Sequence, residues 1–186
     1  MGVYQITVKI KGKEQRLDAY VMENVMYNRD LETIYDLKGS MRSRYTKGVA
    51  GKSSSGASVV LMDENLVEAL SADPILLDWR AHERLMDAIH NDTSFLSQLN
   101  VMDYSLLVGV DARREDLVVG IIDFIRQYTW DKQLETWAKS SGIVGGTSKG
   151  APTVTSPVNY MERFRKQMQS YFRIMPDRWT PPELFS

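Results

Sequence analysis

Two aspartates in this sequence stand where a carboxylate needs a specific partner. Asp103 lies in the largely apolar segment 101–110, and Asp123 lies in the largely apolar segment 117–125. A carboxylate in such surroundings costs several kcal/mol unless it finds hydrogen bonds, a cation or a proton. Two of them on adjacent strands have the chemistry to hold one metal ion and one reacting hydroxyl. The pattern is equally typical of buried, hydrogen-bonded aspartates at strand ends, so residue type and spacing leave both interpretations open.

A second group with chemical potential is the segment 35–40, Tyr-Asp-Leu-Lys-Gly-Ser. At a strand end, Lys38 and the flexible Gly39 present an ammonium group and main-chain N–H groups, which are able to bind phosphate. A plain exit from strand to turn explains the same six residues. The segment is not a Walker loop, and the sequence has no Gly-x-Gly-x-x-Gly pattern.

The elements that must position these residues follow from hydrophobic periodicity. The two aspartate segments predict a β-hairpin joined by the polar turn 111–116. Asp63 is expected to cap a short helix, and Asp73-Pro74 is expected to open a longer one. The other predicted elements are a hairpin of residues 3–11 and 16–22, strands at 31–37 and 59–62, helices at 63–70, 73–89 with an extension at 95–99, 131–140 and 156–175, and loops at 47–58 and 141–156.

Composition places the chain among ordinary globular proteins. Its 186 residues fit one domain, with 43% hydrophobic and 25% charged residues. There is no cysteine, which excludes disulfides and thiolate metal sites. No apolar run is long enough to span a bilayer, and the first residues do not open a signal peptide, so we expect a soluble intracellular protein.

The charge distribution is nearly balanced overall and uneven locally. A formal net charge of −1 gives no field that would draw the chain to nucleic acid, and we expect no nucleic-acid partner. Residues 36–52 and 126–149 are locally basic. Such runs are usually solvated faces, and they are also the means by which proteins attach to anionic surfaces.

Five motifs occur in order along the chain: residues 35–40, Leu61-Met-Asp-Glu-Asn-Leu66, Met102-Asp-Tyr-Ser-Leu-Leu107, Ile121-Ile-Asp123 and Pro176-Asp-Arg-Trp179. Together they resemble the phosphatidylinositol phosphate kinases. Within that family the chain is most similar to the type III class, through residues 2–4, 21–24, 130–132 and 141–146. Enzymes of this class phosphorylate phosphatidylinositol 3-phosphate at the 5-position.

The resemblance implies an α+β fold, distantly similar to that of protein kinases. Residues 1–24 would be a remnant of the N-lobe sheet and the hinge, and residues 25–186 would form the catalytic C-lobe. The activation and specificity loop would span about residues 124–156. The glycine-rich loop and the ATP-contacting lysine of the family's N-lobe do not occur before Val3.

The resemblance also implies roles for single residues. Asp103 would orient or deprotonate the inositol hydroxyl, Asp123 would hold Mg²⁺ on the phosphates of ATP, and Lys38 would neutralise phosphate charge. Adenine would contact the hinge from one side and two apolar side chains from the other. These residues are Met22, Glu23 and Asn24 in the hinge, and Leu106 and Ile122 beneath the base.

The implied function is ATP- and Mg-dependent conversion of phosphatidylinositol 3-phosphate to phosphatidylinositol 3,5-bisphosphate. Lys132, Lys139 and Lys149 of the specificity loop would attach to the phosphoinositide and the anionic membrane, each contributing roughly 1 kcal/mol. The expected location is cytoplasmic, on the cytosolic face of endosomal membranes. The alternative is a catalytically incomplete phosphoinositide-binding module or pseudokinase, since the ATP-gripping segment is not seen. A protein kinase is disfavoured because the His-Arg-Asp and Ala-Pro-Glu motifs are missing.

Overall fold

A four-stranded sheet forms the centre of the computed structural model, which describes residues 2–47, 59–72, 74–111, 113–125, 156–181 and 183. The strand order is β4-β3-β6-β7. β3 (Thr33–Leu37) pairs in parallel with β4 (Val60–Met62). The hairpin of β6 (Ser105–Asp111) and β7 (Asp116–Ile122) joins the other edge of β3 antiparallel, which confirms the predicted pairing of the two aspartate segments.

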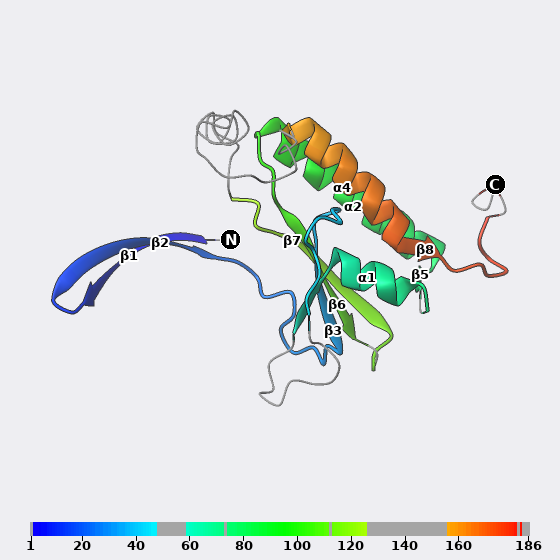
Figure 1. The fold of residues 1–186 in the computed structure, drawn as a ribbon, viewed down its shortest axis with the longest axis horizontal. Helices are drawn as coiled ribbons and strands as arrows, with labels where there is room; N and C mark the ends of the chain where they lie inside the picture. The colour runs from blue at the N-terminus through cyan, green and yellow to red at the C-terminus, as the bar shows by residue number, and fades with distance from the viewer. Residues whose placement is uncertain are drawn as a thin grey trace, which may run out of the picture.

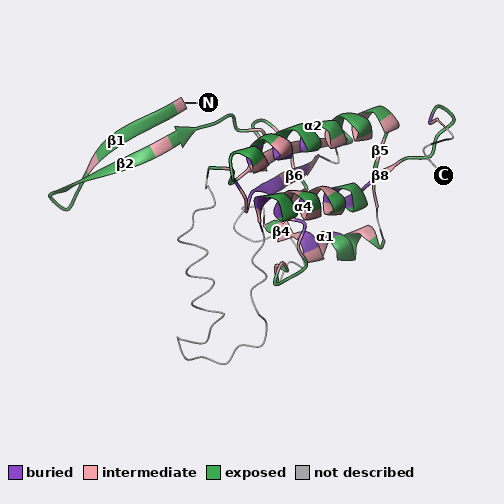
Figure 2. Ribbon diagram, turned by 90° about the horizontal axis from the view of Figure 1, so that it is seen from above, coloured by how far each residue is buried: buried purple, intermediate pink, exposed green. Residues whose placement is uncertain are grey.

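Three helices of the described residues cover one face of this sheet (Figures 1 and 2). They are α1 (Asp63–Leu70), α2 (Trp79–Gln98) and α4 (Pro157–Tyr171). Ser156 caps α4 by accepting from the amide of Asn159 at 3.2 Å, and a proline stands at its first position, as the sequence predicts. No helix in the described ranges is both long enough and apolar enough to cross a membrane.

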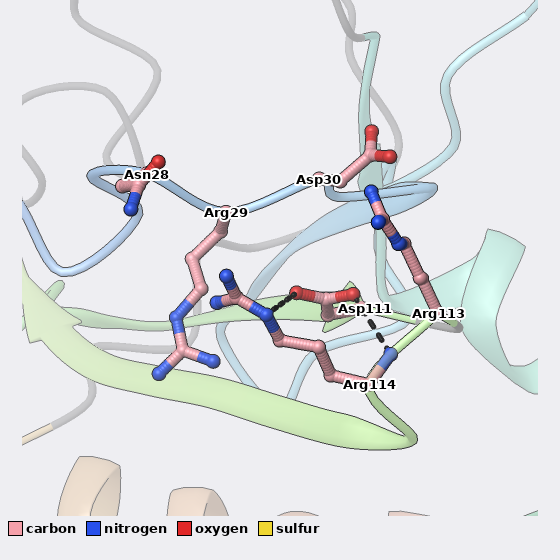
Figure 3. A pocket seen from close by; sticks show the side chains of 6 residues that line it. All are labelled: Asn28, Arg29, Asp30, Asp111, Arg113 and Arg114. Carbon is pink, nitrogen blue, oxygen red and sulfur yellow. Dashed lines mark hydrogen bonds and ion pairs between the residues drawn. The ribbon is translucent and has the colours of Figure 1, made fainter.

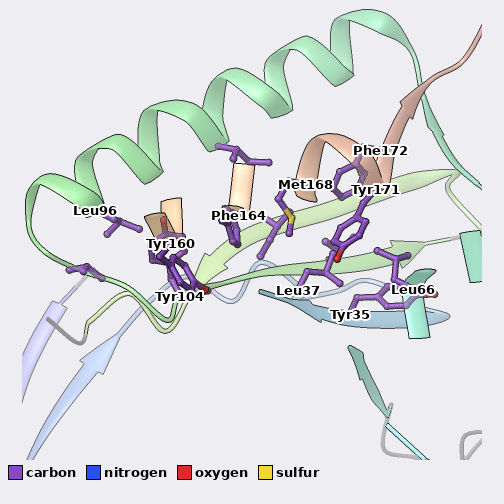
Figure 4. Close-up of a cluster of buried hydrophobic side chains, with 14 residues drawn as sticks. Tyr35, Leu37, Leu66, Leu96, Tyr104, Tyr160, Phe164, Met168, Tyr171 and Phe172 are labelled. Carbon is purple, nitrogen blue, oxygen red and sulfur yellow. The ribbon is translucent and has the colours of Figure 1, made fainter. Parts of the chain in front are cut away.

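The core lies between the sheet and the helices (Figure 4). Its centre is a group of rings in which Tyr104 meets Tyr160 edge-on at 4.8 Å between centroids and Phe164 at 5.1 Å. Such edge-to-face pairs stabilise the core beyond the area that they bury. The α4 residues of this core, Tyr160, Phe164, Met168 and Tyr171, recur at helical spacing, so one helix face supplies much of the packing.

The N-terminal hairpin extends away from this body (Figure 1). β1 (Gly2–Ile10) pairs with β2 (Lys13–Val21), and nearly all their residues are exposed. Positive φ angles of 50° at Lys11 and 79° at Gly12 are those of a tight two-residue hairpin turn. The predicted hairpin is confirmed, with its turn one residue earlier than expected.

The start of the long helix was predicted wrongly. Residues 75–77 form the short strand β5 (Ile75–Leu77), which pairs in parallel with β8 (Phe172–Ile174). Asp78, and not Asp73, caps α2 by accepting from two amides of the first turn at 3.0 Å each. The helix then runs without a break to Gln98. The predicted helix 131–140 and most of the two predicted loops lie outside the described residues.

Candidate active site

Lys38, Asp103 and Asp123 come together at one edge of the central sheet, the edge formed by the strand ends at Leu37, Ser105 and Ile122. Leu37 at the end of β3 pairs with Leu106, and Ser105 at the start of β6 pairs with Ile122 at the end of β7. Lys38 therefore follows one strand, Asp103 precedes the second, and Asp123 follows the third, all at the same edge. Neighbouring strands lie about 4.8 Å apart, so the sheet itself brings the three positions close together.

Both aspartates have a left-handed backbone conformation. The φ angle is 67° at Asp103 and 60° at Asp123. Aspartate tolerates this region better than most residues, because its short side chain hydrogen-bonds locally, yet the conformation is sparsely populated and concentrates at functional sites. Asp123 is exposed and Asp103 is partly buried. The two strand ends are thus bent where the carboxylates leave the sheet.

The turn that carries Lys38 depends on Gly39. Its φ of 64° favours glycine, and a Cβ atom there would come within 3.2 Å of the Phe164 main chain and 3.1 Å of Gln167 Cβ. The turn therefore lies directly against α4. Lys38 itself is partly buried.

Sequence reasoning assigned Asp63 to a helix cap and so missed its contacts with this turn. Met62 occupies the cap position, and Asp63 is the first residue of α1. Its fully buried carboxylate accepts from the amides of Lys38 and Gly39. The sequence signals for Asp63 are its place after a short apolar strand and within the motif of residues 61–66. Neither identifies its partners, which lie 24 and 25 positions earlier.

The register separates two residues that were expected to lie together beneath adenine. Leu106 is 2% exposed and belongs to the core on the helix-covered face. Ile122 pairs with Ser105, so its side chain points to the opposite face. Leu107, which was not among the predicted adenine contacts, shares the Ile122 face. The reason is the strand period of two, which places neighbours in sequence on opposite sides.

The segment after the predicted hinge crosses that opposite face. A Cβ atom on Gly120 of β7 would contact Val25 at 3.5 Å, and one on Gly109 of β6 would meet Leu31 at 2.8 Å. Met22, Glu23 and Asn24 are exposed where the chain leaves β2. Asn24 closes a local turn, since its side chain accepts from the amide of Met26 at 3.1 Å.

Within the described ranges, the arrangement of carboxylates suits magnesium better than a fully protein-bound metal. No group of three or more His, Cys, Asp or Glu side chains gathers there in a way that would hold an ion. Mg²⁺ typically takes one or two carboxylates, several waters and the phosphates of its substrate. Asp123, exposed at the sheet edge, fits that donor set. Lys132, Lys139 and Lys149 lie outside the described residues.

Tyrosine hydroxyls near this edge stay neutral at physiological pH. Burial raises the pKa of Tyr104, the residue after Asp103, to about 12. Burial also raises the pKa of Tyr160, whose hydroxyl donates to the main-chain oxygen of Tyr104. Neither phenol therefore supplies a negative charge beside the aspartates.

A cavity of about 340 Å³ lies at the far end of the β6–β7 hairpin (Figure 3). Arg29 Nη1 forms a salt bridge there with Asp116 Oδ2 at 2.7 Å, and Oδ1 of the buried Asp111 accepts from the Arg114 amide at 3.2 Å. Because these residues flank the turn, the cavity is separated from the aspartate edge by the length of both strands. It is lined by Asn28, Arg29, Asp30, Asp111, Arg113 and Arg114.

A mixed α+β domain with a basic turn and two carboxylates at one sheet edge has the composition of a phosphoryl-transfer site. The chain belongs to the phosphatidylinositol-4-phosphate 5-kinase family, whose model matches residues 1–118 and 111–171. The name of this family describes kinases of phosphoinositide lipids.

Several curated relatives carry the name 1-phosphatidylinositol 3-phosphate 5-kinase. The chain is 52% identical to FAB1A and 50% identical to FAB1B, both of Arabidopsis thaliana, over 97% and 99% of its length. It is 47% identical to the Homo sapiens enzyme over 97% of its length. The matched part is 10%, 10% and 8% of these relatives, so the chain spans about a tenth of their length. The resemblance to the type III class is confirmed.

Proposed function

We propose that this chain carries the catalytic residues for ATP- and Mg-dependent phosphorylation of phosphatidylinositol 3-phosphate, giving phosphatidylinositol 3,5-bisphosphate. The observation that carries the proposal is the meeting of Lys38, Asp103 and Asp123 at one sheet edge, with both aspartates in the left-handed conformation. The names of the relatives support the substrate. They also favour an enzyme over a lipid-binding module without catalysis.

Each of the three side chains has a separate task in the proposed reaction. Asp103 orients the 5-hydroxyl of the inositol ring and takes its proton as the oxygen attacks the γ-phosphorus of ATP. A new oxygen–phosphorus bond forms, the bond between the γ-phosphorus and the bridging oxygen breaks, and ADP leaves. Lys38 neutralises charge on the phosphates throughout. Asp123 holds Mg²⁺, which when bound supplies charge neutralisation on the β- and γ-phosphates.

The nucleotide base belongs on the sheet face that bears Ile122 and Leu107. The segment from Met22 to Asn24 leads onto this same face through Val25, which supports a hinge role for it. We expect no contact between Leu106 and adenine, because Leu106 is buried on the helix-covered face. Residues 1–24 then supply part of an N-lobe sheet, and residues 25–186 supply a protein-kinase-like C-lobe.

Attachment to the membrane belongs to the loop 124–156 in this proposal. Lys132, Lys139 and Lys149 attract the anionic lipid surface and the phosphoinositide, and the expected place is the cytosolic face of endosomal membranes. Three lysines supply a few kcal/mol at roughly 1 kcal/mol each, which suits transient docking.

The Asp123→Asn variant tests the metal-binding part of the proposal. Calorimetric titration with ATP, with and without Mg²⁺, should show that Mg²⁺ tightens binding to the wild-type chain and not to the variant. Asp116→Asn is the matched control, since Asp116 lies at the other end of the same strand. If Mg²⁺ tightens ATP binding equally in Asp123→Asn and in the wild-type chain, Asp123 does not hold the metal.

A further inference from the structure

We propose that Asp63 is a positioning residue that fixes the turn carrying Lys38 at the sheet edge where Asp103 and Asp123 lie. The inference rests on the proposed function of Lys38 and deepens it. Asp63 lies 25 residues beyond Lys38 in sequence, at the start of α1, and its carboxylate is fully buried. It touches none of the three side chains of the candidate site by any hydrogen bond in the described residues, so its effect on the reaction passes through the backbone of the turn.

The carboxylate of Asp63 accepts four hydrogen bonds. Oδ2 accepts from the Lys38 amide at 3.1 Å and from Arg44 Nε at 2.9 Å. Oδ1 accepts from the Gly39 amide at 2.8 Å and from the Tyr171 hydroxyl at 3.0 Å. Hydrogen bonds to a charged acceptor are shorter and about twice as strong as neutral ones. Both oxygens are thus fully used, and each of them holds one amide of the turn.

The turn is held from its other side by α4. Gly39 lies so close to that helix that a Cβ atom would come within 3.2 Å of the Phe164 main chain. The backbone of Lys38 and Gly39 is therefore clamped between a carboxylate and a helix. Because the Lys38 side chain begins at this backbone, the clamp fixes the direction from which the ammonium group approaches the edge. Catalysis by charge neutralisation depends on such prior positioning.

Arg44 links the clamp to the strand that precedes the turn. Its Nη2 donates to Asp36 Oδ1 at 2.8 Å and also to the main-chain oxygen of Asp36. One guanidinium thus joins the last part of β3 to the carboxylate that holds residues 38 and 39. It also offsets the cost of burying the Asp63 charge, which would be several kcal/mol without a partner.

Stability alone is a poor explanation for a charge at this position. Replacing a buried ion pair by packed apolar groups often leaves stability unchanged or raises it. What an apolar residue does not supply is two acceptors for two successive amides of one turn. The contacts of Asp63 therefore point to the geometry of Lys38 as the property that this carboxylate sets.

A double-mutant cycle separates positioning from a general effect on folding. Transfer rates would be measured for Lys38→Ala, Asp63→Asn and the double variant, in the 186-residue chain and in a version extended at its N-terminus with sequence of Arabidopsis FAB1A. Asn keeps the size of Asp but offers one acceptor in place of two. We expect Asp63→Asn to lower kcat by about 10- to 100-fold, and to add less than about twofold when Lys38 is already alanine.

Two further measurements keep the test decisive. Hydrogen exchange of the Lys38 and Gly39 amides should quicken at least about tenfold in Asp63→Asn. Gly39→Ala disturbs the turn from the α4 side, so it should lower kcat and cause no further loss when it is combined with Lys38→Ala. This variant keeps the inference testable if Asp63→Asn fails to fold. Thr93→Val is the control, because Thr93 is fully buried and its hydroxyl is hydrogen-bonded to Ile89 and Arg165, away from this turn. It should change the melting temperature without changing kcat.

The outcomes distinguish this inference from the function on which it rests. If Lys38→Ala transfers phosphate as fast as wild type, the proposed role of Lys38 is wrong and the Asp63 inference falls with it. If Lys38→Ala is inactive while Asp63→Asn and Gly39→Ala keep the wild-type kcat, only the Asp63 inference is overturned. Losses that multiply in the double variants overturn it as well, because Asp63 would then act independently of Lys38.

Discussion

Replacement of Asp103 by asparagine, alanine and glycine separates its chemistry from its backbone conformation. Asparagine matches aspartate in size and tolerates a positive φ, but it does not take a proton. Alanine removes the side chain and is strained at the φ of 67° observed here. Glycine removes the side chain and adopts this φ without strain. All three variants lose the group that we assign to the inositol hydroxyl.

The expected magnitudes differ between activity and stability. Loss of a general base lowers the rate by about 100- to 10,000-fold, equivalent to roughly 3–5 kcal/mol of transition-state stabilisation. All three variants should show a loss of this size. The left-handed conformation should make Asp103→Ala less stable than Asp103→Asn by roughly 1 kcal/mol. For a chain of this length, that difference lowers the melting temperature by about 2–4 °C.

Two assays check these values on the same preparations. Initial rates of phosphate transfer at saturating ATP report the chemistry, and thermal melting followed by circular dichroism reports the strain. Binding to vesicles containing phosphatidylinositol 3-phosphate should be equal in all variants. If Asp103→Asn keeps more than about a tenth of the wild-type rate, Asp103 is not the base. If Asp103→Ala and Asp103→Asn melt together, the argument from backbone strain is wrong.

Three other predictions concern the core, its titration and the membrane. The Tyr104 hydroxyl is buried with no hydrogen-bond partner in the described ranges, so Tyr104→Phe should raise the free energy of unfolding by roughly 1 kcal/mol. The Tyr160 hydroxyl donates a hydrogen bond, so Tyr160→Phe should lower the free energy of unfolding by a similar amount. Urea unfolding that gives the same sign for both variants would contradict this. Because burial raises the pKa of Tyr104 from 10.0 to about 12, the unfolded chain loses this phenol proton at a lower pH than the folded one. Stability should therefore fall as the pH rises from 10 to about 12, and Tyr104→Phe should remove that part of the alkaline loss in melts recorded from pH 9 upward. Charge reversal at Lys132 and Lys139 should weaken binding to anionic vesicles at low salt and have less effect at high salt. If vesicle sedimentation shows the same loss of binding at both salt concentrations, these lysines have no electrostatic role.

Much of the central sheet was predictable from local pattern. The two apolar segments around a polar turn predict the β6–β7 hairpin, and its pairing follows from the alternation of residues. That hairpin alone places Asp103 and Asp123 at the same edge. The position of Lys38 beside them was not available from pattern, because it depends on the long-range pairing of β3 with β6.

The features that sequence reasoning missed arise from contacts between distant segments. Residues 75–77 fit a helix locally, and they form a strand because residues 172–174 offer a partner nearly a hundred positions later. Asp63 fits a helix cap locally, and its burial follows from contacts with Gly39 and Tyr171. Leu106 was placed beneath the base with Ile122 by the family resemblance, and apolar character alone does not show which face of a strand the helices cover.

Transfer of labelled phosphate from ATP to a panel of phosphoinositides tests the central claim most directly. The assay would use the chain alone and a version extended at its N-terminus with FAB1A sequence, each with Mg²⁺ and with chelator. We predict label on the 5-position of phosphatidylinositol 3-phosphate in at least the longer protein, dependent on Mg²⁺ and abolished by Asp103→Asn. Absence of labelled lipid from both proteins, with intact binding to phosphatidylinositol 3-phosphate vesicles, would contradict the account and indicate a phosphoinositide-binding module.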